Sequence, residues 1–293
     1  NIANRFCCKH EMSLTGFATT MLRSAPAKLA QRGLCTTNDH YAAVRESYHR
    51  AWFYAKDSPY EKWQLDCIVE TLGSGLDSEE ARIADIGGGT GRFAGLLHQK
   101  LDLKQKVLCV DMSEEMLKEA QKVPGVSTKC ADAASFAASL EPKSFDRFLL
   151  KEIVHHLGFE ECAGMYKDLA RGLQDGGRCV TVTRPKYEFE YPMFDAARKV
   201  WELNQEDASL YAGYMRDAGF NDVRCSVLEF PVTMQLKDWT NMVKIRMWST
   251  FSESHFSEKK LLEGIKEIEE KYPTDLNGNV SFNEKIVLIQ GSV

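Results

Sequence analysis

Short apolar runs alternate with helical stripes through the middle of the chain. Each run is followed by a stretch in which apolar residues recur every three or four positions, the period of an amphipathic helix. Apolar strands joined by helical crossovers predict a parallel sheet, with ligands at the carboxyl ends of its strands. The predicted strands are 82–86, 106–110, 126–130, 145–150 and 178–183, and the predicted crossover helices are 92–101, 113–122, 133–139 and 159–173.

Two helices are predicted before the first strand. Residues 39–55 carry aromatic and apolar residues at helical spacing. A second helix starts at Ser58-Pro59, where Ser caps the helix and Pro suits the first turn, and it ends at Gly73. Residues 39–73 thus hold two N-terminal cap helices.

The regular alternation ends after the fifth strand. The pattern predicts a helix with apolar positions between 194 and 203, a helix at 208–218, a sixth strand at 222–232 and helical structure over 237–272. The final strand is predicted at 285–289. We expect the inserts at about 185–207 and 236–276 to form a lid.

A glycine-rich turn separates the first strand from its helix. Asp85-Ile86 leads into Gly87-Gly88-Gly89-Thr90-Gly91, with four glycines in five positions. Glycine tolerates positive φ and lets a ligand approach the main chain, and the free N–H groups of the next helix face the same place. By itself such a turn fits a nucleotide site or an ordinary tight turn.

Two acidic residues at later strand ends favour the nucleotide site. Asp111 ends the second strand, where folds of this kind place a carboxylate that accepts ribose hydroxyls, and Asp132 follows the third strand. A dinucleotide fingerprint would need a third glycine where Arg92 stands, and Asp85 would face a pyrophosphate unfavourably. A carboxylate at Asp85 suits a ligand that bears an ammonium group.

The stretch resembles the class I S-adenosylmethionine-dependent methyltransferases. These enzymes carry Asp-x-Gly-x-Gly-x-Gly after the first strand and acids after the second and third. The resemblance implies a Rossmann-like α/β fold: a seven-stranded sheet, mostly parallel with an antiparallel last strand at the sheet edge, helices on both faces and a helical lid. It also implies that the cap helices, 39–73, lie over the cofactor and substrate. It implies S-adenosylmethionine as cofactor, with predicted cofactor-binding residues Asp85, Gly87, Gly89, Gly91, Asp111, Met112, Asp132, Ala133 and Lys151.

Candidate catalytic residues follow the fourth strand. His155 and His156 stand where the family's loop faces the transferred methyl group, and imidazole titrates near neutral pH, as a general base requires. Adjacent side chains point in different directions, so we expect one of them, with His155 favoured, to face the methyl. The alternative for each is a histidine that packs the helix start. For substrate contacts we expect Tyr48, Arg184 and Arg246.

Charge and one missing motif limit the class of molecule that accepts the methyl group. Lys and Arg total 37 against 42 Asp and Glu, so no overall positive charge attracts nucleic acid. The Asn/Asp-Pro-Pro-Tyr/Phe motif that some macromolecular methyltransferases carry is missing where Lys151-Glu152-Ile153-Val154 stands. We therefore expect a small-molecule acceptor, methylated on O, N or S. A protein or RNA acceptor, and a non-catalytic binding protein of the same fold, remain the alternatives.

The remaining sequence signals concern location and metals. Residues 1–38 read as a disordered tail or an organelle transit peptide, because 12–38 lack acidic residues and carry Arg, Ser and Thr. Nine cysteines without a Cys-x-x-Cys pair indicate a reducing compartment, cytoplasmic or the mitochondrial or plastid matrix. No metal site and no membrane span are predicted. The oligomeric state stays open.

Overall fold

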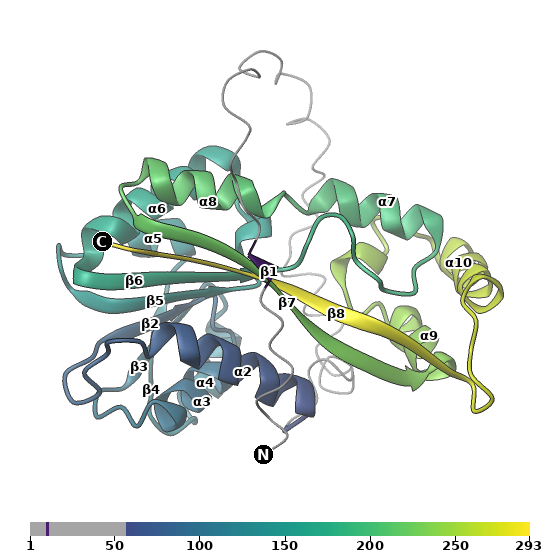
Figure 1. Cartoon of the computed structure of the whole chain (residues 1–293), viewed down its shortest axis with the longest axis horizontal. Helices are drawn as coiled ribbons and strands as arrows, with labels where there is room; N and C mark the ends of the chain where they lie inside the picture. Colours follow the sequence, from purple (N-terminus) through teal and green to yellow (C-terminus); the bar gives the residue numbers. More distant parts are fainter. Residues whose placement is uncertain (1–9, 12–56) are drawn as a thin grey trace, which may run out of the picture.

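The computed structural model describes residues 10–11 and 57–293, which form one mixed sheet with helices on both faces (Figure 1). The sheet order is β1-β7-β8-β6-β5-β2-β3-β4. The strands are β1 (His10–Glu11), β2 (Ile83–Ile86), β3 (Val107–Asp111), β4 (Val126–Cys130), β5 (Phe145–Lys151), β6 (Leu173–Thr183), β7 (Asn221–Gln235) and β8 (Asn279–Ser292). The helices are α2 (Pro59–Leu72), α3 (Arg92–Lys100), α4 (Glu114–Ala120), α5 (Ala133–Ala138), α6 (Phe159–Gly172), α7 (Asp195–Asn204), α8 (Ala208–Asp217), α9 (Leu236–Lys244) and α10 (Glu258–Lys271), with short 3-10 turns η2 (Val154–His156) and η3 (Ser249–Phe251).

The central strands are parallel, as the alternating pattern predicts. β2 pairs in parallel with β3 and β5, β3 with β4, and β5 with β6. Their carboxyl ends therefore meet at one edge, where the loops after β2, β3 and β5 lie together. Apart from the two-residue β1, the described strands form the expected seven-stranded Rossmann-like sheet.

The last strand corrects one expectation. β8 is antiparallel, as predicted, but it lies between β6 and β7 and not at the sheet edge. Val287 of β8, for example, is paired with Thr183 on one side and Val227 on the other. β8 satisfies the open hydrogen-bonding edges of both β6 and β7, so β7 lies one place further out and pairs with β1 on its other side.

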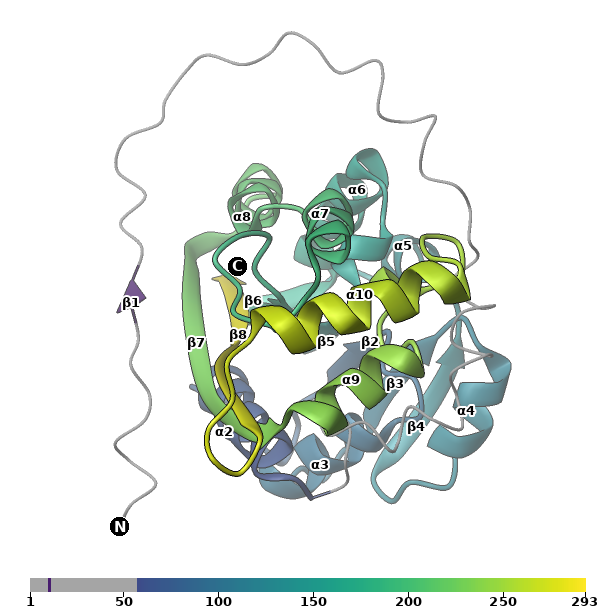
Figure 2. The same cartoon turned by 90° about the vertical axis from the view of Figure 1, so that its right-hand side faces the viewer.

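β7 and β8 are much longer than the central strands. They have 15 and 14 residues, and their pairing continues from Asn221↔Ser292 to Gln235↔Asn279. The outer half of this two-stranded ribbon carries α7, η3, α9 and α10, which we call the outer helix cluster (Figures 1 and 2). The sequence pattern ends the sixth strand at 232 and begins the last one at 285, because Glu284 interrupts the apolar run.

The outer helix cluster has a hydrophobic core of its own. Aromatic residues dominate it, with Tyr191, Trp239 and Phe251 fully buried. Tyr191 and Trp239 stack at 6.2 Å between ring centroids, and Tyr191 meets Trp248 edge to face at 4.8 Å. Such pairs add specific geometry to the burial of apolar area, so the cluster is rigidly packed.

The predicted helix over 237–272 is interrupted. α9 ends at Lys244 and α10 begins at Glu258, with the 3-10 turn η3 between them. Arg246 has φ 57°, outside the helical region, and its Nη1 donates to the main-chain oxygen of Phe251 at 2.5 Å. The prediction was wrong here because this turn is fixed by a side-chain hydrogen bond that apolar spacing does not report.

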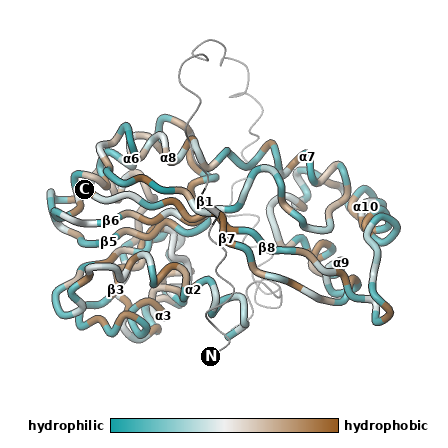
Figure 3. Tube along the Cα trace, in the orientation of Figure 1, coloured by the Kyte–Doolittle hydropathy of each residue, from teal (hydrophilic) through white to brown (hydrophobic). Residues whose placement is uncertain are grey.

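Helices cover the sheet on both faces. α2, α3 and α4 pack on one face, and α5, α6 and α8 on the other, with the apolar residues of the central strands between them (Figure 3). α2 begins as predicted, because Ser58 Oγ accepts a hydrogen bond from the main-chain N–H of Glu61 at 3.0 Å. α6 ends at Gly172, and Gly176 lies inside β6, where its N–H donates to Val293 O. The predicted helix 39–55, and the segment 1–38 apart from His10–Glu11, lie outside the described residues.

Candidate active site

The glycine loop after β2 has the strained geometry that only glycine adopts easily. Gly87, Gly89 and Gly91 have φ of 75°, 56° and 68°. A Cβ on Gly87 would lie 2.1 Å from Ile153 Cγ2, and one on Gly91 would lie 2.7 Å from Ala120 Cβ. A Cβ on Gly89 would meet nothing within 4 Å. Packing therefore requires two of these glycines, and the third borders open space that a ligand can enter.

Asp111 lies beside that open space at the end of β3. Its Oδ2 accepts a hydrogen bond from the N–H of Gly89 at 2.9 Å, and its Oδ1 accepts one from the N–H of Ser113 at 2.9 Å. Each carboxylate oxygen keeps a second acceptor position. The carboxylate is thus held in place and can still accept hydroxyl groups of a ligand.

Asp85 is the most deeply buried acid of the loop. Its side chain is 2% exposed, and its Oδ2 has no hydrogen-bond partner. Burial raises the pKa of Asp85 to about 7; Lys151 lowers it and Asp111 raises it further. A buried acceptor without a donor is rare in native structures, so this oxygen marks a place where a ligand donor is expected.

The other predicted cofactor residues border the same edge of the sheet. Met112 is 58% exposed, directly after Asp111, and Ala133 is the first residue of α5. Asp132 caps α5 by accepting from the N–H of Ser135 at 2.8 Å, and these hydrogen bonds lower its pKa. Lys151 Nζ lies 5.1 Å from the centre of the Phe93 ring, and burial lowers its pKa. Their contacts with a cofactor stay predictions.

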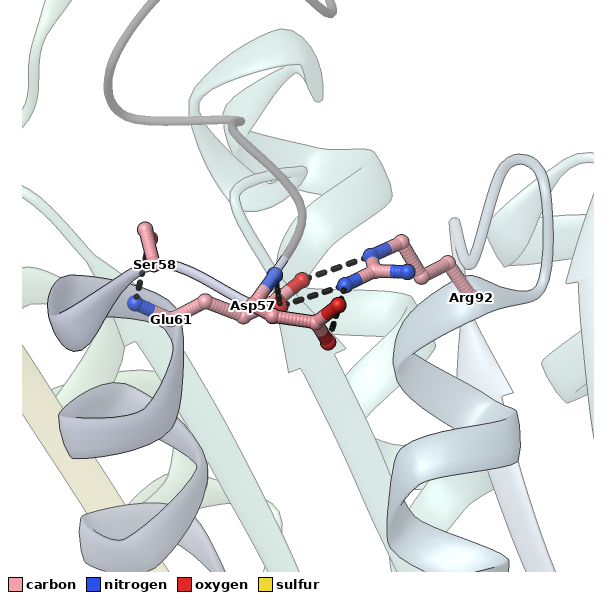
Figure 4. Close-up of polar contacts among 4 residues, drawn as sticks. All are labelled: Asp57, Ser58, Glu61 and Arg92. Carbon is pink, nitrogen blue, oxygen red and sulfur yellow. Dashed lines mark hydrogen bonds and ion pairs between the residues drawn. The ribbon is translucent and has the colours of Figure 1, made fainter.

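An ion pair links the glycine loop to α2. Arg92, the first residue of α3, donates from Nε to Glu61 Oε1 at 2.7 Å and from Nη2 to Glu61 Oε2 at 2.6 Å (Figure 4). Asp57 lies 3.5 Å from the same Nη2, and its N–H donates to Glu61 Oε2. A two-pronged pair is geometrically specific, so it fixes the direction in which α2 meets the loop.

The two histidines lie in η2, after β5. Their ring centroids are 4.0 Å apart, and His156 is exposed. His155 Nδ1 is buried with no hydrogen-bond partner. Burial lowers the pKa of His155 to about 4, with Arg184 adding to the effect, so the ring is neutral at pH 7. A neutral imidazole with a free nitrogen can accept or donate one hydrogen bond to an acceptor substrate.

Arg184 joins two carboxylates of its own chain. Its Nη1 lies 2.7 Å from Glu152 Oε2, and its Nε lies 3.1 Å from Glu284 Oε1. Tyr60 donates to the same Oε1 of Glu284 at 3.1 Å, and Trp248 lies over the guanidinium at 5.4 Å. The carboxylates hold the pKa of Arg184 well above its usual value although burial opposes them. The guanidinium predicted to bind a substrate carboxylate thus already has two internal partners.

Glu152 was not among the sequence-predicted site residues. It has φ 61°, a conformation that costs a non-glycine residue on the order of 1–3 kcal/mol and that is common at functional sites. Its Oε1 is buried without a partner, as is Oγ1 of Thr183 on the neighbouring strand. Position after a strand was the one available signal, because a Lys-Glu pair is not distinctive in sequence.

No contact among the described residues links the other two predicted substrate residues to Arg184 or Glu152. Arg246 belongs to the outer helix cluster, where it also lies 3.5 Å from Glu258. Tyr48 lies outside the described residues.

The comparison with known families decides the class of the domain. Residues 83–177, which contain the glycine loop, Asp111 and η2, match the family described as Methyltransferase domain. They form a class I S-adenosylmethionine-dependent methyltransferase domain.

The similarity to an individual curated relative covers only a part of the chain. A curated relative, the protein-lysine N-methyltransferase EFM4 of Saccharomyces cerevisiae, is 32% identical over 90 residues, which are 28% of this chain and 38% of that protein. The chain thus matches less than half the length of this curated relative.

Solved structures show the same fold. Phosphoethanolamine N-methyltransferase 2 of Haemonchus contortus, in complex with phosphomonomethylethanolamine and S-adenosylhomocysteine, superposes with a TM-score of 0.54 at 18% identity, over 89% of this chain and 59% of that one. The cyclase SpnF superposes with a TM-score of 0.55 at 14% identity, over 87% of this chain and 94% of that one. Because one of these is a cyclase, the fold alone does not identify the reaction.

The residues of the methyltransferase domain fit S-adenosylmethionine. Gly89 borders free space, Asp111 can take ribose hydroxyls, and the partner-free Oδ2 of Asp85 suits the ammonium group of the cofactor. Among the described residues, no group of three or more His, Cys, Asp or Glu side chains could hold a metal ion. Within residues 57–293 we also find no helix with the length and hydropathy of a membrane span.

Proposed function

We propose that this protein transfers the methyl group of S-adenosylmethionine to a small-molecule acceptor. The observation that carries the proposal is a set of four buried polar atoms without partners among the described residues, which lie in or just after β2, β5 and β6. They are Asp85 Oδ2, Glu152 Oε1, His155 Nδ1 and Thr183 Oγ1. Buried polar atoms in native proteins nearly always have a hydrogen-bond partner, so we expect ligand groups to bind at these positions.

On the cofactor side, the roles are those that the resemblance implies, and the contacts described above support those of Asp85 and Asp111. Asp111 would accept the ribose hydroxyls, and Asp85 would hold the ammonium group. Met112, Asp132 and Ala133 would border the adenine, and Lys151 would lie near the other end of the cofactor. The bound cofactor supplies an electrophilic methyl group on a sulfonium.

On the acceptor side, the chain provides hydrogen-bond acceptors and an aromatic wall beside them. The ring of His155 is neutral at pH 7, and its Nδ1 can accept a hydrogen bond from the acceptor. Glu152 can orient the acceptor. The aromatic core of the outer helix cluster lies above this end of the site through Trp248 and Tyr191. Exclusion of water and correct positioning provide much of the rate of methyl transfer.

Two alternatives differ in the acceptor and in the reaction. The curated relative EFM4 acts on protein lysine, which favours a protein acceptor, although the match spans only part of either chain. The likeness to the cyclase SpnF favours a protein that keeps the fold for another purpose. The nearly balanced charge of this chain and the burial of its partner-free atoms favour a small acceptor over both.

The proposal is tested in two steps on the full chain. Calorimetry measures binding of S-adenosylmethionine and S-adenosylhomocysteine, with Asp111→Ala as the variant expected not to bind. Methyl transfer from labelled S-adenosylmethionine is then measured on a low-molecular-weight cell extract and, separately, on the macromolecular fraction with and without protease. Label in the small-molecule fraction supports the proposal. Protease-sensitive label in the macromolecular fraction would replace it with a protein acceptor, and absence of cofactor binding would refute it.

A further inference from the structure

We infer that Glu152 binds the acceptor and that the acceptor is an amine, whose N–H group donates to Glu152 Oε1. The inference rests on the proposed function, and it names the class of acceptor that the site selects.

The carboxylate of Glu152 is fixed in place. Arg184 holds Oε2 at 2.7 Å, and the main-chain N–H of Glu152 donates to Val182 O at 2.8 Å. The positive φ of Glu152 sets the direction of its side chain against ordinary backbone preference. Oε1 therefore remains at a defined point, buried and without a donor among the residues that the structure describes.

The charges around Glu152 favour a donor that is neutral or positive. The single guanidinium of Arg184 is shared between Glu152 and Glu284, and Tyr60 donates a neutral hydrogen bond to Glu284. Asp85 adds a third buried carboxyl group and Lys151 a second cation. A ligand carboxylate or phosphate beside Oε1 would face a like charge in a buried place, which is unfavourable, whereas an amine N–H or ammonium is attracted.

The available bases also favour nitrogen over an alcohol oxygen. A neutral amine attacks with its lone pair and needs no prior ionisation, whereas an aliphatic hydroxyl needs a strong base. The partner-free imidazole three positions after Glu152 is a weak base, since burial lowers the pKa of His155 to about 4. So weak a base cannot ionise an alcohol, whereas a neutral amine attacks without one, and the proton of the methylated ammonium product is lost to solvent.

The surroundings of Arg184 indicate the kind of amine. Trp248 lies over the guanidinium, and Tyr191 meets Trp248 edge to face. An amine carried on an apolar or aromatic body suits such a wall. Matched pairs of amine and alcohol, such as phenethylamine with 2-phenylethanol and tyramine with its alcohol analogue, therefore separate the contribution of nitrogen from that of the body.

The test uses the full chain saturated with S-adenosylhomocysteine. Calorimetry measures binding of each amine and its matched alcohol, and labelled S-adenosylmethionine with mass spectrometry identifies any N-methyl product. We expect the amines to bind at least about tenfold more tightly than the alcohols, and to be the methylated partners. Equal or tighter binding of the alcohols, or no amine binding at millimolar concentration, overturns the inference. Failure to bind S-adenosylhomocysteine would instead refute the proposed function.

A variant assigns the preference to Glu152. In Glu152→Gln we expect amine affinity to fall at least about tenfold, with S-adenosylhomocysteine affinity unchanged. The control Glu141→Gln removes a charge from an exposed residue after α5 and should change neither. If Glu152→Gln binds amines as wild type does, Glu152 is not the contact. If that variant fails to fold, the amine-to-alcohol ratio of the wild-type protein still decides the acceptor class.

Discussion

The main-chain N–H of Gly89 donates to Oδ2 of Asp111 at 2.9 Å, so the glycine loop and the end of β3 form one unit. The residue predicted to hold the ribose also fixes the loop that faces it. Cofactor recognition and loop geometry therefore depend on the same carboxylate.

Replacement of Asp111 separates these two roles. In Asp111→Asn the oxygen that accepts from Gly89 can remain, but the charge and one acceptor are lost, so we expect cofactor affinity to fall about 10- to 100-fold. In Asp111→Ala both N–H groups lose their partner, and binding should be lost. Calorimetry with S-adenosylhomocysteine measures both variants. Wild-type affinity in Asp111→Ala would contradict the ribose assignment.

Two glycines of the loop should respond differently to alanine. Gly87→Ala places a methyl 2.1 Å from Ile153 Cγ2, so we expect loss of folding stability of about 2–4 kcal/mol, from overpacking and positive φ together. Gly89→Ala meets open space and should lower stability by only about 1 kcal/mol, but it fills the place of the ligand. Thermal unfolding and cofactor titration compare the two. A stable Gly87→Ala protein would show that η2 can move away from the loop.

The raised pKa of Asp85 predicts pH-dependent cofactor binding. Below about pH 7 this carboxyl group is protonated in the free protein, and an ammonium-bearing ligand requires it ionised. We expect proton release on binding at pH values below 7, with affinity rising as pH increases through 7. Calorimetry in buffers of different ionisation enthalpy measures the released protons. In Asp85→Asn the release should disappear, and an unchanged release would point to another group.

The same shift has a consequence for stability without ligand. The folded pKa of Asp85 lies above its ordinary value of 3.8, so between about pH 4 and 7 the folded protein binds more protons than the unfolded chain. This group therefore makes the folded state less stable as pH rises through that window. Asp85→Asn should remove this trend in urea unfolding.

His155→Ala tests the predicted general base. We expect turnover to fall about tenfold or more, with cofactor affinity unchanged, because Nδ1 has no partner among the described residues and can hydrogen-bond the acceptor. The lowered pKa keeps His155 neutral down to about pH 4, so its contribution should persist across the neutral range and fail only in acid. His156→Ala, at the exposed neighbour, is the matched control. Equal turnover in wild type and His155→Ala would end the assignment.

The local part of the site could be predicted from sequence. Positive φ at Gly87, Gly89 and Gly91 follows from residue type, and Asp111 and Asp132 stand at strand ends that apolar runs mark. These features need only neighbouring residues to be recognised.

The acceptor end could not be predicted in this way. Glu284 is separated from Arg184 by 100 positions and reaches it because β8 enters the sheet beside β6. In sequence, Glu284 only interrupts an apolar run. The internal partners of Arg184 therefore depend on the order of the strands in the sheet. The partner-free Oε1 of Glu152 depends on it as well.

The outer helix cluster stands on the β7–β8 ribbon and packs around an aromatic core that meets the core beside the glycine loop through α2, at Tyr60 and Trp63. Sequence change among these aromatic residues can reshape what the protein accepts and leave what it uses as methyl donor untouched. A lineage of such proteins could therefore diversify in substrate by altering one appendage of an otherwise constant scaffold.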